Sequence, residues 1–180
     1  MKIQLLFKKE ECMSLSDNPI KYIKNFLNKR QLEKPSIVTN PDNKDMMVEN
    51  DIVGLDIINI KNKERIRLLS SDLTVFNDYA FKYYVPQFIL CYFKSYKYIF
   101  IDMFLLSLCE STILSKTSKR YLQFDTEEIK IILFFLEAVL NKLDINNNFT
   151  EEYLSELKDL EFDANMAIDF WKKHPSKNQE

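Results

Sequence analysis

The hydrophobic residues of this chain are concentrated between residues 73 and 143, in three stretches separated by polar segments. The stretches cover residues 73–93, 98–109 and 121–143, and all three contain several aromatic side chains. In the third, apolar residues recur every three or four positions, which is the spacing of a helix with one buried face. The pattern predicts a mainly α-helical bundle whose core is formed by this part of the chain.

The clearest helix start lies at Asp125. Glu128 follows it by three residues, as in a capping box, where two side chains satisfy backbone N–H groups that the first helical turn leaves free. We therefore predict a helix that begins here and ends near Leu143. Thr150, followed by two glutamates, predicts a second long helix that continues to Trp171.

Prolines mark two further helices. Pro19, preceded by the capping residues Asp17 and Asn18, predicts a helix that continues to Gln31. The solvent-exposed face of this helix is expected to carry Lys21, Lys24, Lys29 and Arg30. Pro86 cannot donate a backbone N–H and disfavours helical geometry at the residue before it. A helix is therefore expected to begin near Pro86 or to be kinked there.

The remaining segments are less regular. Residues 33–44 contain two prolines and no helical periodicity, which predicts a loop. Residues 46–69 mix helical and alternating spacings; we predict a helix here, and a short strand pair with residues 1–7 is the alternative. Residues 98–110 are expected to form a buried helix that is apolar on nearly every side, and residues 111–119 a polar link.

A length of 180 residues is enough for one hydrophobic core. We predict a single α-helical domain over residues 1–180, with its core at about 64–173 and a loose tail at 175–180. The chain contains one glycine, Gly54. This disfavours turn-rich β architecture, and it excludes the glycine-rich loops that bind phosphate groups of nucleotides.

The sequence contains no obvious membrane or export segment. The longest apolar run, residues 98–109, is interrupted by Asp102 and is shorter than the roughly 20 residues that span a bilayer. The apolar stretch at the N-terminus is too short for a signal peptide. Three cysteines, an odd number, suit a reducing compartment. We expect a cytoplasmic protein that does not enter the membrane.

Residues that could carry catalysis or bind a metal are scarce. His174, the only histidine, lies beside a proline near the end of the chain, which argues against imidazole-based metal sites and acid–base pairs. Cys91 and Cys109 lie in apolar stretches, where a thiol behaves as a small hydrophobe. Glu127 and Glu128 lie at a helix start, which already accounts for acidic side chains. We predict no catalytic residue, no cofactor and no metal, and hence no enzyme.

Charge is distributed unevenly along the chain. Residues 125–163 contain eleven acidic and three basic side chains, a net charge of about −8, and residues 2–34 carry a net charge of about +4. An acidic helical face can steer and hold a basic protein partner, such as a nuclease. The plainer explanation is a face that keeps the protein soluble. The predicted partner-binding residues are Glu127, Glu137, Glu151, Glu152, Glu156 and Asp159.

The sequence also bears on two other ligand classes, nucleic acids and small molecules. Direct nucleic-acid binding is disfavoured by the acidic sequence pI of about 5.6. The aromatic residues between Tyr79 and Tyr98 are numerous enough to suggest that some stay at the surface as anchors for a protein. They could instead line the pocket of a small-ligand-binding protein or an enzyme. A structural subunit of a larger assembly is a third alternative.

One succession of motifs resembles a family of small bacterial proteins that is filed as a domain of unknown function. The motifs are Ser71-Asp72-Leu73, the segment FKYYVPQFIL from Phe81, and the helix start FDTEEI from Phe124 that leads to Phe135-Leu136-Glu137. They lie within residues 64–140, and a tryptophan expected before the first motif is absent. The resemblance implies a helical cytoplasmic protein and transfers no catalytic residue. By analogy of class, we expect a protein-binding module, most concretely an immunity protein or antitoxin that neutralises a bacterial toxin.

Overall fold

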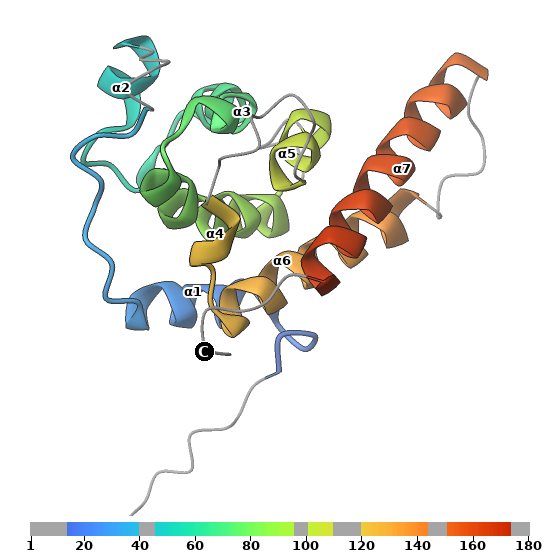
Figure 1. The fold of residues 1–180 in the computed structure, drawn as a ribbon, viewed down its shortest axis with the longest axis horizontal. Coiled ribbons are helices and arrows are strands. Elements are labelled where there is room, and N and C mark those ends of the chain that lie inside the picture. Colours follow the sequence, from blue (N-terminus) through green and yellow to red (C-terminus); the bar gives the residue numbers. More distant parts are fainter. Residues whose placement is uncertain (1–13, 40–45, 96–100, 110–119, 144–150, 174–180) are drawn as a thin grey trace, which may run out of the picture.

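The structure is a computed structural model that describes residues 14–39, 46–95, 101–109, 120–143 and 151–173 (Figure 1). The α-helices of these residues are α1 (Pro19–Lys29), α2 (Met46–Ile52), α3 (Lys63–Ser71), α4 (Asp78–Lys94), α5 (Ile101–Leu108), α6 (Thr126–Leu143) and α7 (Glu151–Lys173). Short 3-10 turns add η2 (Ile57–Asn59), η3 (Leu73–Val75) and η5 (Arg120–Gln123). The described residues contain no strand, only an isolated antiparallel bridge between Thr39 and Phe76. The predicted mainly α-helical bundle is confirmed.

Helix α4 lies in the centre of the bundle, with α1 and α3 on opposite sides of it (Figure 1). Its first turn is capped by Asn77, whose side-chain oxygen accepts a hydrogen bond from the Ala80 backbone N–H at 2.8 Å. Every residue from Tyr83 to Tyr92 is buried. A helix that is apolar on all sides belongs in the interior, and α4 takes that position.

Pro86 lies inside α4, so the first alternative, a helix that begins near this residue, is wrong, whereas the second, a kink at Pro86, stays a prediction. A proline leaves the carbonyl four residues before it without a helical partner. That carbonyl, on Lys82, accepts a hydrogen bond from Arg30 Nη2 at 2.7 Å. Arg30 Nη1 donates to the neighbouring Tyr83 carbonyl at 3.1 Å. A side chain from a distant segment thus replaces the bond that Pro86 cannot make.

Helix α1 begins as predicted, because Asn18 Oδ1 accepts a hydrogen bond from the Lys21 N–H at 3.0 Å. Lys21, Lys24 and Lys29 are exposed, as expected. Arg30 was placed with them, and this was wrong, since only 8% of its side chain is exposed. Arg30 follows the last helical residue and has extended backbone angles. Helical periodicity therefore does not determine where its side chain points.

Residues 46–69 form three helical pieces, α2, η2 and the start of α3, joined by non-helical residues, instead of one helix. Gly54 lies between α2 and η2 with a φ of 71°, a left-handed conformation that side chains disfavour. The strand alternative is wrong for this segment, and residues 1–7, its proposed partner, lie outside the described residues. Ile52 in α2 and Ile57 in η2 are both fully buried in the core. Their burial in helical turns outweighs the preference of isoleucine for strands.

The predicted apolar helix is confirmed as α5 (Ile101–Leu108), but it is buried on one side only, so the expectation that it is a fully buried helix is wrong. Phe104, Leu105 and Leu108 are fully buried. Met103 and Leu106, in contrast, are each 37% exposed. The polar link, the tail after Pro175 and His174 lie outside the described residues.

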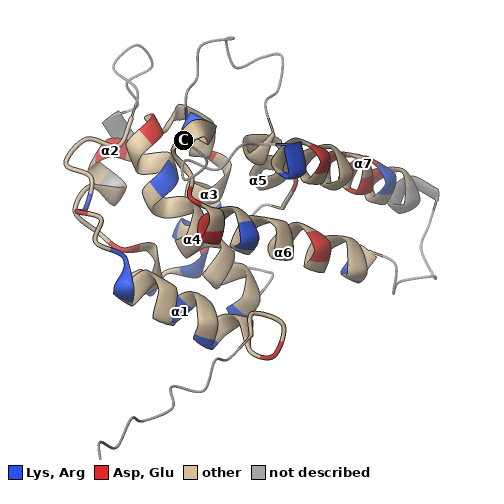
Figure 2. Ribbon diagram, turned by 60° about the horizontal axis from the view of Figure 1, so that its bottom comes forward, with Lys and Arg blue, Asp and Glu red and all other residues tan. Residues whose placement is uncertain are grey.

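Helices α6 and α7 lie side by side (Figures 1 and 2). The predicted capping box at the start of α6 is confirmed. Asp125 Oδ1 accepts hydrogen bonds from the Glu127 and Glu128 N–H groups, and Glu128 Oε2 accepts one from the Asp125 N–H, each at 2.9 Å. Helix α7 closes the bundle through Trp171, which is 1% exposed and donates from Nε1 to the Leu108 carbonyl at 2.7 Å.

The core joins these helices through aromatic and aliphatic side chains. Cys91 and Cys109 are buried among them without a disulfide, as predicted, and burial raises the pKa of the Cys91 thiol to about 11. Most of the aromatic residues of α4 are buried, and Tyr79 is 38% exposed. The core also includes Ile23 and Val38, which precede the segment where it was predicted to begin.

Candidate functional site

The predicted partner-binding residues lie on α6 and α7, where acidic residues are spread along both helices (Figure 2). Glu137, Glu156 and Asp159 are exposed. Glu151 and Glu152 form the first turn of α7, and the structure describes their backbone alone. The structure thus leaves three of the six predicted residues free to contact a partner.

Glu127, another predicted residue, is engaged within the molecule. The hydroxyl of Tyr22 on α1 donates a hydrogen bond to its carboxylate. Lys130 Nζ lies 3.6 Å from the same carboxylate, one turn along α6. Glu127 also lies ten residues from Glu137, or roughly 15 Å along the helix. It therefore fastens α1 to α6 and does not form one compact surface with Glu137.

A compact acidic group exists elsewhere, between α5 and α7. Burial raises the pKa of Asp163, and repulsion from Asp159 and Asp102 raises it further. Asp102 comes from α5 and the other two from α7, so the fold brings together carboxylates that are far apart in the sequence. Among the described residues, none of the three forms an ion pair with Lys or Arg.

Replacing Asp163 with asparagine is expected to raise the melting temperature at neutral pH and low salt. The folded-state pKa of Asp163 is raised, so its contribution to stability is greatest below the unfolded pKa and is lost as pH rises through the folded pKa. The gain should shrink in high salt and at acidic pH. Thermal melts of Asp163→Asn beside Glu161→Gln, an exposed residue of the same helix, would measure this. A lower melting temperature at low salt would contradict the repulsion.

Apolar side chains lie next to these carboxylates. On α7, Phe162 is 62% exposed and Met166 is 42% exposed. With Asp159 and Asp163 they follow the spacing i, i+3, i+4 and i+7, which places all four along one stripe of the helix. Helix α5, which packs on α7, adds exposed residues of its own. We call Asp102, Met103, Leu106, Asp159, Phe162, Asp163 and Met166 the α5–α7 surface.

Glu128, which the sequence placed at a simple helix start, has a second role. It is 1% exposed, and its carboxylate lies 2.6 Å from Arg30 Nη2 and 3.2 Å from Lys82 Nζ. Burial raises the pKa of Glu128 and the two cations oppose this shift; burial lowers the pKa of Arg30. Because every member is held by internal partners, this buried cluster of Arg30, Lys82 and Glu128 joins α1, α4 and α6 and is a structural centre.

A pocket of about 250 Å³ lies beside this cluster. Its lining residues are Leu27, Asn28, Arg30, Leu32, Lys34, Asp56, Ile58, Tyr83 and Gln87. The predicted pocket lined by the aromatic residues 79–98 does not match it, because Tyr83 is its one aromatic member. The other described aromatics of α4 fill the core instead or, like Tyr79, reach the surface. Within the described residues, no group of three or more His, Cys, Asp or Glu side chains could hold a metal ion.

Comparison with known proteins yields no relative. No family model, no curated protein and no solved structure matches this chain. The resemblance to a family of small bacterial proteins therefore stays a prediction. Among the helices of the described residues, none combines the length and hydrophobicity needed to cross a bilayer.

Proposed function

We propose that this protein is a non-enzymatic binding module that holds a basic protein partner on its α5–α7 surface. The observation that carries the proposal is the stripe on α7 where exposed Phe162 and Met166 alternate with Asp159 and Asp163. Energetically important residues of protein interfaces are commonly apolar or aromatic anchors surrounded by polar groups. The α5–α7 surface combines both kinds of side chain.

Electrostatics favours a cationic partner. Burial raises the pKa of Asp163, and repulsion from the negative charges of Asp159 and Asp102 raises it further in the free chain. An Arg or Lys side chain from a partner would relieve that repulsion, and the same charges would accelerate the encounter. Binding should then lower the pKa of Asp163 and release protons near its folded pKa. Complex formation is therefore expected to depend on both salt and pH.

An immunity protein or antitoxin is the most concrete form of this proposal. Toxins that act on nucleic acids carry basic surfaces, because they must bind phosphate groups. A small acidic helical protein that covers such a surface would neutralise the toxin without any chemistry of its own. A partner captured from the source organism should then bind with fixed stoichiometry. Growth of cells that produce this partner should be restored by co-production of the chain.

Charge reversal tests the surface directly. Exposed Glu156 lies three residues before Asp159 and extends the same stripe of α7. We expect Glu156→Lys, Asp159→Lys and Asp163→Lys together to weaken binding of the captured partner by at least about tenfold at low salt and to flatten the salt dependence of Kd. The matched control reverses Asp17, Glu33 and Glu64, which are exposed elsewhere and change the net charge equally. Titration calorimetry over a salt series measures both. Equal losses in the two variants would show that only net charge matters and would reject this interface.

The apolar part of the surface gives a separate prediction. Phe162→Ala is expected to leave the free energy of unfolding within about 0.5 kcal/mol of the original value, since the side chain is 62% exposed. The same change should raise the Kd for the captured partner by about tenfold or more if Phe162 is an anchor. Leu68→Ala, at an apolar residue of α3 that is 52% exposed, is the control for binding. Unchanged affinity in Phe162→Ala would remove α7 from the interface.

A further inference from the structure

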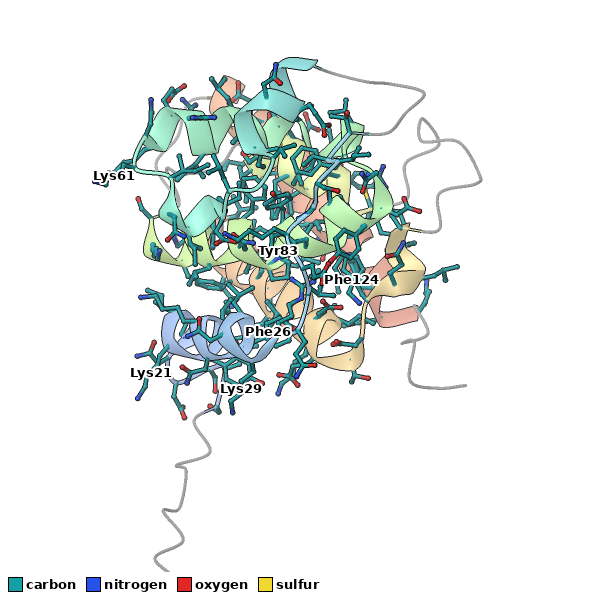
Figure 3. The ribbon with its side chains drawn as sticks, turned by 90° about the vertical axis from the view of Figure 1, so that its left-hand side faces the viewer. Lys21, Phe26, Lys29, Lys61, Tyr83 and Phe124 are labelled. Atoms are coloured by element: carbon teal, nitrogen blue, oxygen red, sulfur yellow. The ribbon has the colours of Figure 1, made fainter. Side chains whose placement is uncertain are left out.

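The pocket beside the buried cluster carries polar groups that the helical bundle does not need. It lies where the end of α1 and the segment after it meet η2 and α4. In Figure 3, Tyr83 of α4 lies on the side of its helix toward Phe26 of α1, whereas Lys21 and Lys29 point away from the bundle. Three aliphatic side chains, Leu27, Leu32 and Ile58, form the apolar part of the lining.

Gln87 is the polar residue that most needs explanation. It is 3% exposed, and its Oε1 atom has no hydrogen-bond partner among the described groups. A buried acceptor without a donor costs free energy, so native structures seldom leave one unsatisfied. Arg30 Nε, a donor that also lacks a partner, belongs to the same lining. Each of these two atoms has less than 1 Å² of accessible surface, so a ligand in the pocket reaches it only if its side chain turns.

An ion pair supplies two further groups. Lys34 Nζ lies 2.8 Å from Asp56 Oδ2, and the Tyr83 hydroxyl donates to Asp56 Oδ1 at 2.7 Å. Lys34 is 49% exposed and Asp56 is 20% exposed, so their attraction is screened by solvent. Breaking the Lys34–Asp56 ion pair and replacing it with ion pairs to a charged ligand would therefore cost little free energy. Asp56 stays ionised, because Lys34 and Tyr83 outweigh the effect of burial and lower its pKa.

We propose that this pocket binds a free α-amino acid with an aliphatic side chain. The ammonium group of the ligand would lie against Asp56, with the amide of Gln87 turned toward it, and the carboxylate of the ligand would face Lys34. The aliphatic side chain would contact Leu27, Leu32 and Ile58. A volume of about 250 Å³ is just below the range of drug-sized pockets, which suits a ligand of this size.

Zwitterion recognition separates this ligand from similar small molecules. Leucine, 4-methylpentanoate and 3-methylbutylamine share an aliphatic chain, but the last two lack the ammonium group or the carboxylate. In titrations followed by heteronuclear NMR of the full chain, leucine should shift the signals of the pocket residues. Each of the other two should bind at least about tenfold more weakly, because a hydrogen-bonded charge is lost.

Lys34→Met is the variant of choice, because its exposed side chain can be changed without disturbing the core. It should weaken leucine binding by about tenfold, whereas Lys24→Met, an equally basic and exposed residue of α1, should not. Gln87→Leu should also weaken binding, with circular dichroism as the check that it folds. The triple variant Glu156→Lys, Asp159→Lys and Asp163→Lys on α7 should bind leucine with unchanged affinity. This result would separate the pocket from the proposed partner surface.

Two outcomes would overturn the proposal. One is the absence of any shift in the pocket residues with each standard amino acid at up to about 10 mM, well above a millimolar Kd. The other is equal affinity for leucine and the two analogues that lack one charge, which would mean that the pocket recognises only the aliphatic chain.

Discussion

Replacing Glu128 with alanine is expected to lower the free energy of unfolding by about 3–5 kcal/mol. The change removes a carboxylate that is 1% exposed and leaves Arg30 and Lys82 without their anion. It also removes the acceptor for the Asp125 N–H, so half of the capping box is lost. Urea unfolding followed by the fluorescence of Trp171, the only tryptophan, measures the effect.

The control for this prediction is Glu137→Ala, because Glu137 is exposed on the same helix. It should change the free energy of unfolding by less than about 0.5 kcal/mol. A double-mutant cycle of Arg30→Met and Glu128→Met isolates the interaction energy between the two side chains. We expect the double variant to lose less free energy of unfolding than the two single variants lose together. If Glu128→Ala costs no more than Glu137→Ala, the buried cluster does not hold the three helices together.

The local signals in the sequence predicted helix starts well. Asn18 and Asp125 both cap their helices as expected, because a cap depends on residues within one turn of each other. The side chain of Arg30 could not be placed in this way. It follows the end of α1, and its partners on α4 and α6 lie more than 50 residues away.

Pro86 illustrates the same limit from the opposite direction. Local rules require a helix to start or bend at a proline, because one backbone hydrogen bond is lost. Here the freed carbonyl of Lys82 is satisfied by Arg30, which no pattern around Pro86 reveals. The sequence predicted the helical class of the fold from periodicity, whereas the course of its central helix depends on a contact between distant segments.

The candidate surface was predicted only in part. The exposed positions of Glu156 and Asp159 followed from the amphipathic pattern of α7. Asp102 was missed, because its approach to Asp163 depends on the packing of α5 against α7. One available signal was Phe162, a large apolar residue that lies off the buried stripe of α7.

Replacing Trp171 with alanine is expected to destabilise the bundle by about 3–5 kcal/mol, since a fully buried tryptophan leaves a large cavity. Its ring lies 5.1 Å from the Phe124 ring and 5.8 Å from the Tyr121 ring, between centroids, and its N–H donates to the Leu108 carbonyl. One side chain therefore joins α7 to α5 and to the segment that leads into α6. Because the variant has no tryptophan, thermal and urea unfolding must be followed by circular dichroism.

Two further variants separate the parts of this effect. Trp171→Phe keeps an aromatic ring and loses the hydrogen bond to Leu108, so we expect a smaller cost, about 1–3 kcal/mol. Phe162→Ala removes a ring of the same helix that is 62% exposed and should change little. If Trp171→Ala and Phe162→Ala were equally mild, α7 would not be anchored through Trp171. The α5–α7 surface would then lack one support that a preformed interface needs, because Trp171 joins α7 to the end of α5.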